Sequence, residues 1–142
     1  FTMTEYDLMQ MSPFRWIDLF GDGSLRMATG FEGFVGVANT SKLSVAFGKR
    51  KKGKVRVLAV GGKPQATAAA DDFLRDIEDG SAAKKTKRWL DQNLTDTQRN
   101  HLATQGIEVN GFDFSWTKYK AACMLSFMWN RSPIEHAVEA YL

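Results

Sequence analysis

The hydrophobic pattern changes its spacing partway along the chain, and this change constrains the fold more than any other feature. Within residues 30–62 apolar side chains alternate with polar or small ones, most clearly over 43–47 and 55–59. Such alternation is typical of strands that bury one face. After residue 65 the apolar positions recur every three or four residues, which is typical of amphipathic helices. A run of strands followed by a run of helices predicts an α+β fold rather than a parallel α/β sheet.

Three strands are expected in the alternating stretch. The first is the glycine-rich run 31–37, which is closed by turn-forming residues at 39–41. The second and third are the alternating runs 43–47 and 55–59, with Gly53 in the short loop between them. Two alternating runs joined by a short glycine-containing loop predict a β-hairpin. The expected sheet is therefore a three-stranded antiparallel meander.

An N-terminal helix is expected before the meander. Ser12 and Pro13 suit the N-cap and the first helical position, and the segment that follows them carries apolar residues at helical spacing until Gly21. A shorter helix over residues 5–9 is the weaker candidate.

Four to five helices are expected after the meander, packed on the sheet. Their signals are helix-forming composition, a capping box at Thr95, an apolar face that includes Tyr119 and Cys123, and a Ser-Pro start at Ser132. The expected segments are 65–78, 82–94, the helix that follows Thr95 and ends before Gly106, the helix after Trp116, and the last helix from Ser132. No linker rich in proline, glycine or serine interrupts the chain, so residues 1–142 are expected to form a single domain.

Positive charge is concentrated in the second predicted hairpin. The net charge of the chain is +3, yet six positive side chains fall within eight residues, and the remainder of the chain carries −3. These six are Lys49, Arg50, Lys51, Lys52, Lys54 and Arg56. Like charges this close repel each other, so they do not stabilise the fold. A cationic hairpin can instead lie along phosphates and release their condensed counterions.

A second basic group lies in the helix predicted over 82–94. It consists of Lys84, Lys85, Lys87 and Arg88, beside Trp89. For either group alone, a solvated surface is the ordinary interpretation. Two such groups in a chain of 142 residues favour a nucleic-acid interface if the fold brings them together. Trp89 or Phe34 would then be a candidate for stacking on an unpaired base.

Residue types suited to catalysis or metal binding are scarce. The two histidines, His101 and His136, stand among polar neighbours without a nucleophile beside them. Asp72 and Asp76 are one helical turn apart and could hold a metal ion or exchange protons, but a solvated helix face explains them more simply. We therefore expect no catalytic residue, no metal site and no cofactor.

These patterns favour a non-enzymatic accessory protein that binds DNA or RNA through phosphates. Little sequence specificity is expected, because phosphate contacts do not read bases. Small size without catalytic residues is also typical of accessory proteins from phages or plasmids. The alternative is a protein-interaction module, an inhibitor or assembly factor, whose basic hairpin docks on an acidic partner; strand 31–37 would then be a sheet edge open to pairing or self-association. A metal-dependent enzyme built on Asp72 and Asp76 ranks last.

Cysteine content and hydropathy bear on the compartment. Cys123 is the single cysteine, so an intrachain disulfide is impossible, and a reducing, cytoplasmic location is expected. No apolar run approaches the roughly 20 residues that a membrane-spanning helix needs, so no membrane partner is expected.

Overall fold

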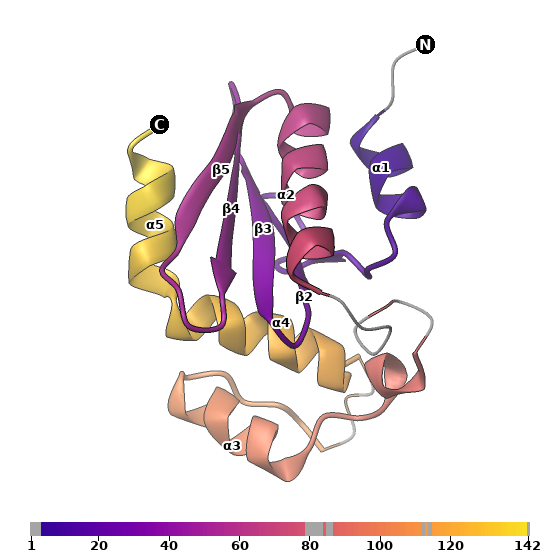
Figure 1. The fold of residues 1–142 in the computed structure, drawn as a ribbon. Helices are drawn as coiled ribbons and strands as arrows, with labels where there is room; N and C mark the ends of the chain where they lie inside the picture. Colours follow the sequence, from indigo (N-terminus) through magenta and orange to yellow (C-terminus); the bar gives the residue numbers. More distant parts are fainter. Residues whose placement is uncertain (1–3, 79–83, 85–86, 112, 114, 142) are drawn as a thin grey trace.

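The computed structural model describes residues 4–78, 84, 87–111, 113 and 115–141. Its fold is α+β, as predicted, with one antiparallel sheet in the order β1-β2-β3-β4-β5 (Figure 1). The elements are α1 (Glu5–Met11), β1 (Ile17–Asp18), β2 (Leu25–Thr29), β3 (Gly33–Asn39), β4 (Ser44–Arg50), β5 (Arg56–Gly61), α2 (Lys63–Ile77), the 3₁₀ turn η1 (Arg88–Asp91), α3 (Asp96–Thr104), α4 (Lys118–Trp129) and α5 (Arg131–Glu139).

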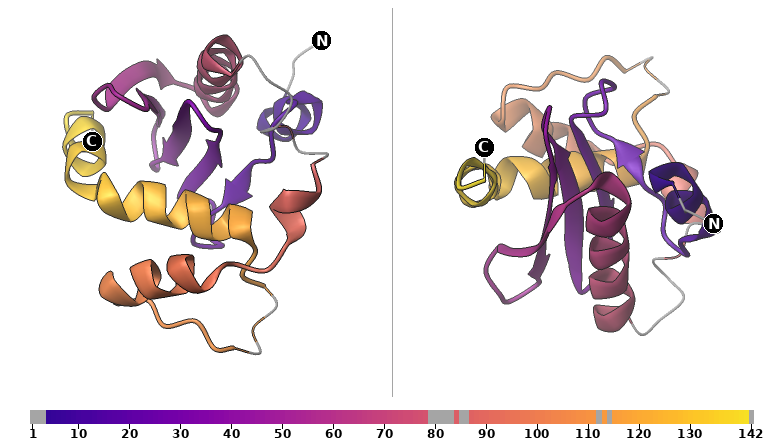
Figure 2. Two further views of the ribbon diagram at one scale, coloured as in Figure 1. Left: turned by 60° about the horizontal axis from the view of Figure 1, so that its bottom comes forward. Right: turned by 90° about the horizontal axis from the view of Figure 1, so that it is seen from above.

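Helices cover the sheet on both faces. α2 packs across one face, and α4 crosses the other (Figure 2). α3 lies outside α4, while α5 contacts β4 and β5 near the end of the sheet. Each face has its own core: Met27 and Phe47 belong to the cluster with α4, whereas Val35 and Ala46 belong to the cluster with α2. Helices α2 and α4 thus bury the two faces of the sheet, which would otherwise be exposed to water.

The sheet has two more strands than the predicted meander. β3, β4 and β5 correspond to the three expected strands, and β1 and β2 extend the sheet on the other side of β3. β2 is buried on both faces, because Met27 faces α4 and Ala28 faces the α2 side. Burial on both faces weakens the period-two pattern that reveals a strand in sequence, and β2 has only five residues in which to show it.

The glycines of β3 make room for a large neighbour. Gly36 pairs with Phe47 of β4, and a Cβ on Gly36 would overlap the Phe47 ring. Phe47 is fully buried as a result. Glycine at this position is therefore explained by close approach within the core.

The helix predicted from Ser12 is wrong, and the weaker candidate is the one that forms. α1 spans Glu5–Met11, and the chain from Ser12 onward leads into β1 without a helix. Ser12 is buried, and its hydroxyl donates to Asp71 Oδ1 of α2 at 2.5 Å while accepting from the Phe14 N–H and from Trp16 Nε1. Ser12, which the local pattern predicts as a helix N-cap, instead binds α2 and keeps the N-terminal segment against that helix (Figure 1).

The later helices match the expected ones unevenly. α2 and α4 form as predicted, and Thr95 and Gln98 make the expected capping box of α3. α5 begins at Arg131 with Asn130 as its N-cap, so Ser132 is not the cap. For the helix predicted over 82–94, the described residues show only the 3₁₀ turn η1, while 82, 83, 85 and 86 lie outside the described residues.

Candidate nucleic-acid interface

The first basic group occupies the turn between β4 and β5. β4 and β5 pair antiparallel, and the N–H of Gly53 donates to the Arg50 carbonyl to close the turn. Lys51, Lys52 and Lys54, here termed the turn lysines, are exposed. Within the described residues no ion pair involves any of them. They are therefore available to a negatively charged ligand.

The other three basic residues of this group make contacts within the protein. The guanidinium groups of Arg50 and Arg56 lie 5.8 and 5.7 Å from the ring centre of Phe73 on α2, and Arg50 also pairs with Asp76 at 3.5 Å. Lys49 is half-buried, and its Nζ donates to the carbonyls of Arg50 and Lys51. Arginine stacked on an aromatic ring fixes the hairpin against α2. This division of roles depends on the contact with Phe73 and could not be predicted from charge alone.

The β2–β3 turn lies beside the turn lysines. The N–H of Lys51 donates to the Glu32 carbonyl at 2.8 Å, and the N–H of Glu32 donates to Glu78 Oε1 at 2.6 Å. Glu78 follows α2, so two turns and one helix end are joined here. Burial of the Glu78 carboxylate raises its pKa, which the Glu32 N–H partly opposes. A pocket of about 240 Å³ opens between these elements, lined by Glu32, Arg50, Lys51, Lys52 and Ile77.

An aromatic pair connects this turn to the second basic group. Phe31, at the β2–β3 turn, is 53% exposed, and its ring centre lies 5.5 Å from that of Trp89 in η1. Trp89 in turn packs on the buried Tyr119, with 5.9 Å between ring centres. Arg88 precedes Trp89 directly, so the fold carries it to the same end of the sheet as the β2–β3 turn.

The two basic groups lie on either side of the β2–β3 turn. One backbone hydrogen bond links Lys51 to Glu32, and one aromatic contact links Phe31 to Trp89. Figure 1 shows the same order from the β4–β5 turn through the β2–β3 turn to η1. Lys84, Lys87 and Arg88, here termed the flanking group, are exposed. Lys85 was also predicted in this group and lies outside the described residues.

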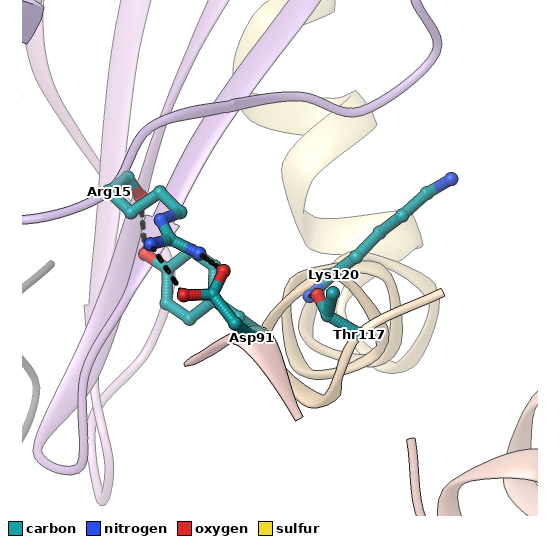
Figure 3. A network of polar contacts seen from close by, with 5 residues as sticks. Arg15, Asp91, Thr117 and Lys120 are labelled. Carbon is teal, nitrogen blue, oxygen red and sulfur yellow. Dashed lines mark hydrogen bonds and ion pairs between the residues drawn. The ribbon is translucent and has the colours of Figure 1, made fainter. Parts of the chain in front are cut away.

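A network of polar contacts holds η1 in place (Figure 3). Arg15 pairs with Asp91 of η1 at 2.5 Å, and this hydrogen bond and charge lower the pKa of Asp91. The hydroxyl of Tyr119 donates to the Arg15 carbonyl at 2.5 Å and accepts from the Thr29 N–H at 3.0 Å. Burial raises the pKa of Tyr119 well above its ordinary value. Thr29 ends β2, so the same tyrosine anchors both η1 and the approach to the β2–β3 turn.

Two sequence-based expectations about this surface are wrong. Phe34 is 6% exposed and belongs to the core beneath α4, so it cannot stack on a ligand. Strand 31–37 is not a sheet edge, because β3 pairs with β2 on one side and with β4 on the other. The aromatic residue that is exposed here is Phe31, which a purely periodic pattern assigns to the strand rather than to the turn.

The remaining candidates for chemistry are dispersed over the described residues. Asp72 and Asp76 are exposed on α2, and Asp76 faces Arg50. Among the described residues, no group of three or more histidine, cysteine, aspartate or glutamate side chains could hold a metal ion. Both histidines are exposed, whereas Cys123 is fully buried, which raises the pKa of its thiol. None of the helices in the described part of the chain is both long and apolar enough to cross a bilayer.

Comparison with known proteins gives a match to a protein family. The family model described as "Mitochondrial helicase Irc3, C-terminal domain" matches residues 2–141. No curated protein and no solved structure gives a significant match.

Proposed function

The chain belongs to the family of the mitochondrial helicase Irc3 C-terminal domain, and from this membership we propose that it binds nucleic acid. Helicases act on nucleic acid, so the family name and the charge distribution agree on the class of ligand. The observation that carries the proposal is the placement of the turn lysines and the flanking group around a single turn of the sheet.

The turn lysines would neutralise phosphates first. They are exposed, and they protrude beyond the arginines that fix the hairpin to α2. The flanking group would contact phosphates on the other side of the β2–β3 turn. Each neutralised phosphate releases condensed counterions, so affinity should fall steeply as salt increases. Contacts between lysines and phosphates do not depend on the bases, so binding should discriminate little between base sequences.

The proposed role is non-enzymatic. Catalysis requires a nucleophile, base or metal ion held in reach of a substrate, and the described residues with such chemistry are separated from one another. Cys123 is buried and the two histidines lie on the surface. The proposal therefore assigns this surface to binding and positioning of nucleic acid.

Two double variants with the same change of charge test the proposal. The first is Lys51→Gln with Lys52→Gln. The control is Lys42→Gln with Lys63→Gln, two exposed lysines at the opposite end of the sheet, where the β3–β4 turn meets the start of α2. Binding to labelled single strands, duplexes and RNA is measured by fluorescence anisotropy across a salt series.

Only the first double variant should weaken binding. Its plot of log Kd against log salt should also lose about 1.4 from its slope on a single strand, since each phosphate contact contributes about 0.7. Equal losses in both double variants would show that net charge alone acts. An absence of binding by the folded wild-type protein at low salt would refute the function and direct the search to an acidic protein partner.

A further inference from the structure

We infer that Phe31 is a stacking platform for one unpaired base, so that the surface described above takes single-stranded nucleic acid in preference to a duplex. This inference rests on the proposed function and deepens it by naming the form of the ligand. It arises from a half-exposed aromatic ring that stands between two sets of cations.

The Phe31 ring is supported from behind. Trp89 lies against it at 5.5 Å between ring centres, and Trp89 rests on the buried Tyr119. Single exposed apolar residues are common and need no explanation. A ring backed by two further aromatic rings is different, because the support keeps it in position while half of its surface stays in water.

Hydrogen bonds also fix the backbone of the residues on both sides of Phe31. The N–H of Gly30 donates to the Gly33 carbonyl at 2.9 Å, and both the N–H and the carbonyl of Glu32 are hydrogen-bonded outside the turn. The Thr29 N–H is bound by Tyr119. A binding residue fixed in this way loses little conformational freedom when a ligand arrives, which favours affinity.

Charge at the turn separates the place for a base from the places for phosphates. Glu32 and Glu78 put carboxylates at the β2–β3 turn itself, which disfavours a phosphate there. Lys51 and Arg88 lie to either side of the turn. A strand that crosses the turn can therefore set a base on Phe31 while its phosphates meet the cations on both sides.

Stacking on Phe31 requires a base with a free face. In a duplex both faces of each internal base are covered by neighbouring pairs, so Phe31 could stack on such a base only if the base left the helical stack. In a single strand the base is available, and stacking on an aromatic side chain tolerates any base because each has a π face. The ligand class is thus single-stranded DNA or RNA with weak sequence preference.

The test compares Phe31→Ala with Phe31→Trp and with the control Phe20→Ala, which removes another half-exposed phenylalanine. The probes are an oligothymidylate of about 16 nucleotides, a duplex of the same length, and an abasic strand that keeps only sugars and phosphates. Anisotropy gives Kd for each pair, and circular dichroism confirms that each variant is folded.

Loss of one stacked base should weaken oligothymidylate binding by about 5- to 150-fold in Phe31→Ala. Phe31→Trp should retain binding, and Phe20→Ala should match the wild type. Phe31→Ala should leave the abasic strand and the duplex unchanged. If the abasic strand binds as tightly as oligothymidylate and Phe31→Ala changes neither, the stacking role is refuted while phosphate binding stands. If no probe binds the wild type, both proposals fall.

Discussion

Replacement of Tyr119 by phenylalanine should destabilise the protein through a single hydroxyl. That hydroxyl belongs to a fully buried side chain and has two partners in the backbone, the Arg15 carbonyl at 2.5 Å and the Thr29 N–H at 3.0 Å. Tyr119→Phe keeps the ring, so no large cavity forms and the packing against Trp89 remains. The variant therefore isolates the contribution of the hydrogen bonds.

The expected loss is about 2–3 kcal/mol in the free energy of unfolding. A buried N–H without a partner costs about 1–3 kcal/mol, and Thr29 is almost completely buried. Arg15 is partly exposed, so its carbonyl can bind water and its share is about 1 kcal/mol or less. The two contributions sum to at most about 4 kcal/mol. Removal of the hydroxyl also removes the cost of burying it, which brings the expected loss to about 2–3 kcal/mol.

Urea unfolding followed by circular dichroism measures the loss. With an m-value of about 2 kcal/mol/M, the midpoint should fall by about 1–1.5 M and the m-value should stay the same. Tyr141→Phe is the matched control, because Tyr141 is exposed and should change stability by less than about 0.5 kcal/mol. A loss in Tyr119→Phe as small as that of the control would refute the reasoning, since both backbone groups would then be satisfied without the hydroxyl.

Two further predictions follow from buried polar groups. Ser12→Ala should lower the free energy of unfolding by about 1–3 kcal/mol, because it leaves the buried carboxylate of Asp71 without the hydroxyl that binds it at 2.5 Å. The control is Ser41→Ala, which changes an exposed serine and should have no such effect. Equal urea midpoints for the two variants would contradict the stabilising role of the Ser12 hydroxyl. Cys123 should react with a thiol reagent slowly in the native state at about pH 8 and rapidly in guanidinium chloride, because burial raises its pKa in the folded protein. The thiol ionises at about pH 8.5 in the unfolded state and stays protonated in the folded state at that pH. The free energy of unfolding should therefore fall as pH rises above this value. A free energy of unfolding that does not change with pH in this range would contradict the prediction.

On the proposed binding surface, the residues that stabilise the fold differ from those that present positive charge. The arginines of the β4–β5 turn stack on Phe73, and Arg15 secures η1 through Asp91. The turn lysines take no part in such contacts among the described residues. Their repulsion is tolerated because exposed charges are screened by water and salt. Substitution of the turn lysines should therefore affect binding far more than folding, which makes them suitable test positions.

Local patterns predicted those parts of the fold that depend on neighbours in sequence. The alternating runs 43–47 and 55–59 located β4 and β5, and the glycine-rich run 31–37 with the turn residues after it located β3. The spacing of Thr95 and Gln98 located the start of α3, since a capping box closes within four residues. The concentration of lysine and arginine in two short segments could likewise be predicted from the sequence. β2 was not located in this way, because it has only five residues and is buried on both faces, which leaves a weak pattern.

The sequence by itself determined the α+β class, most helices, and the existence of two basic groups. Tertiary structure alone decided which residues meet. Ser12 and Asp71 are 59 residues apart, and Thr29 and Tyr119 are 90 apart, so no local rule connects them. The contact of Phe31 with Trp89 likewise joins residues that are far apart in sequence. Periodicity and capping act over one or two turns of chain, whereas a surface is assembled by packing elements from distant segments, and that packing is what brings the two basic groups to one turn of the sheet.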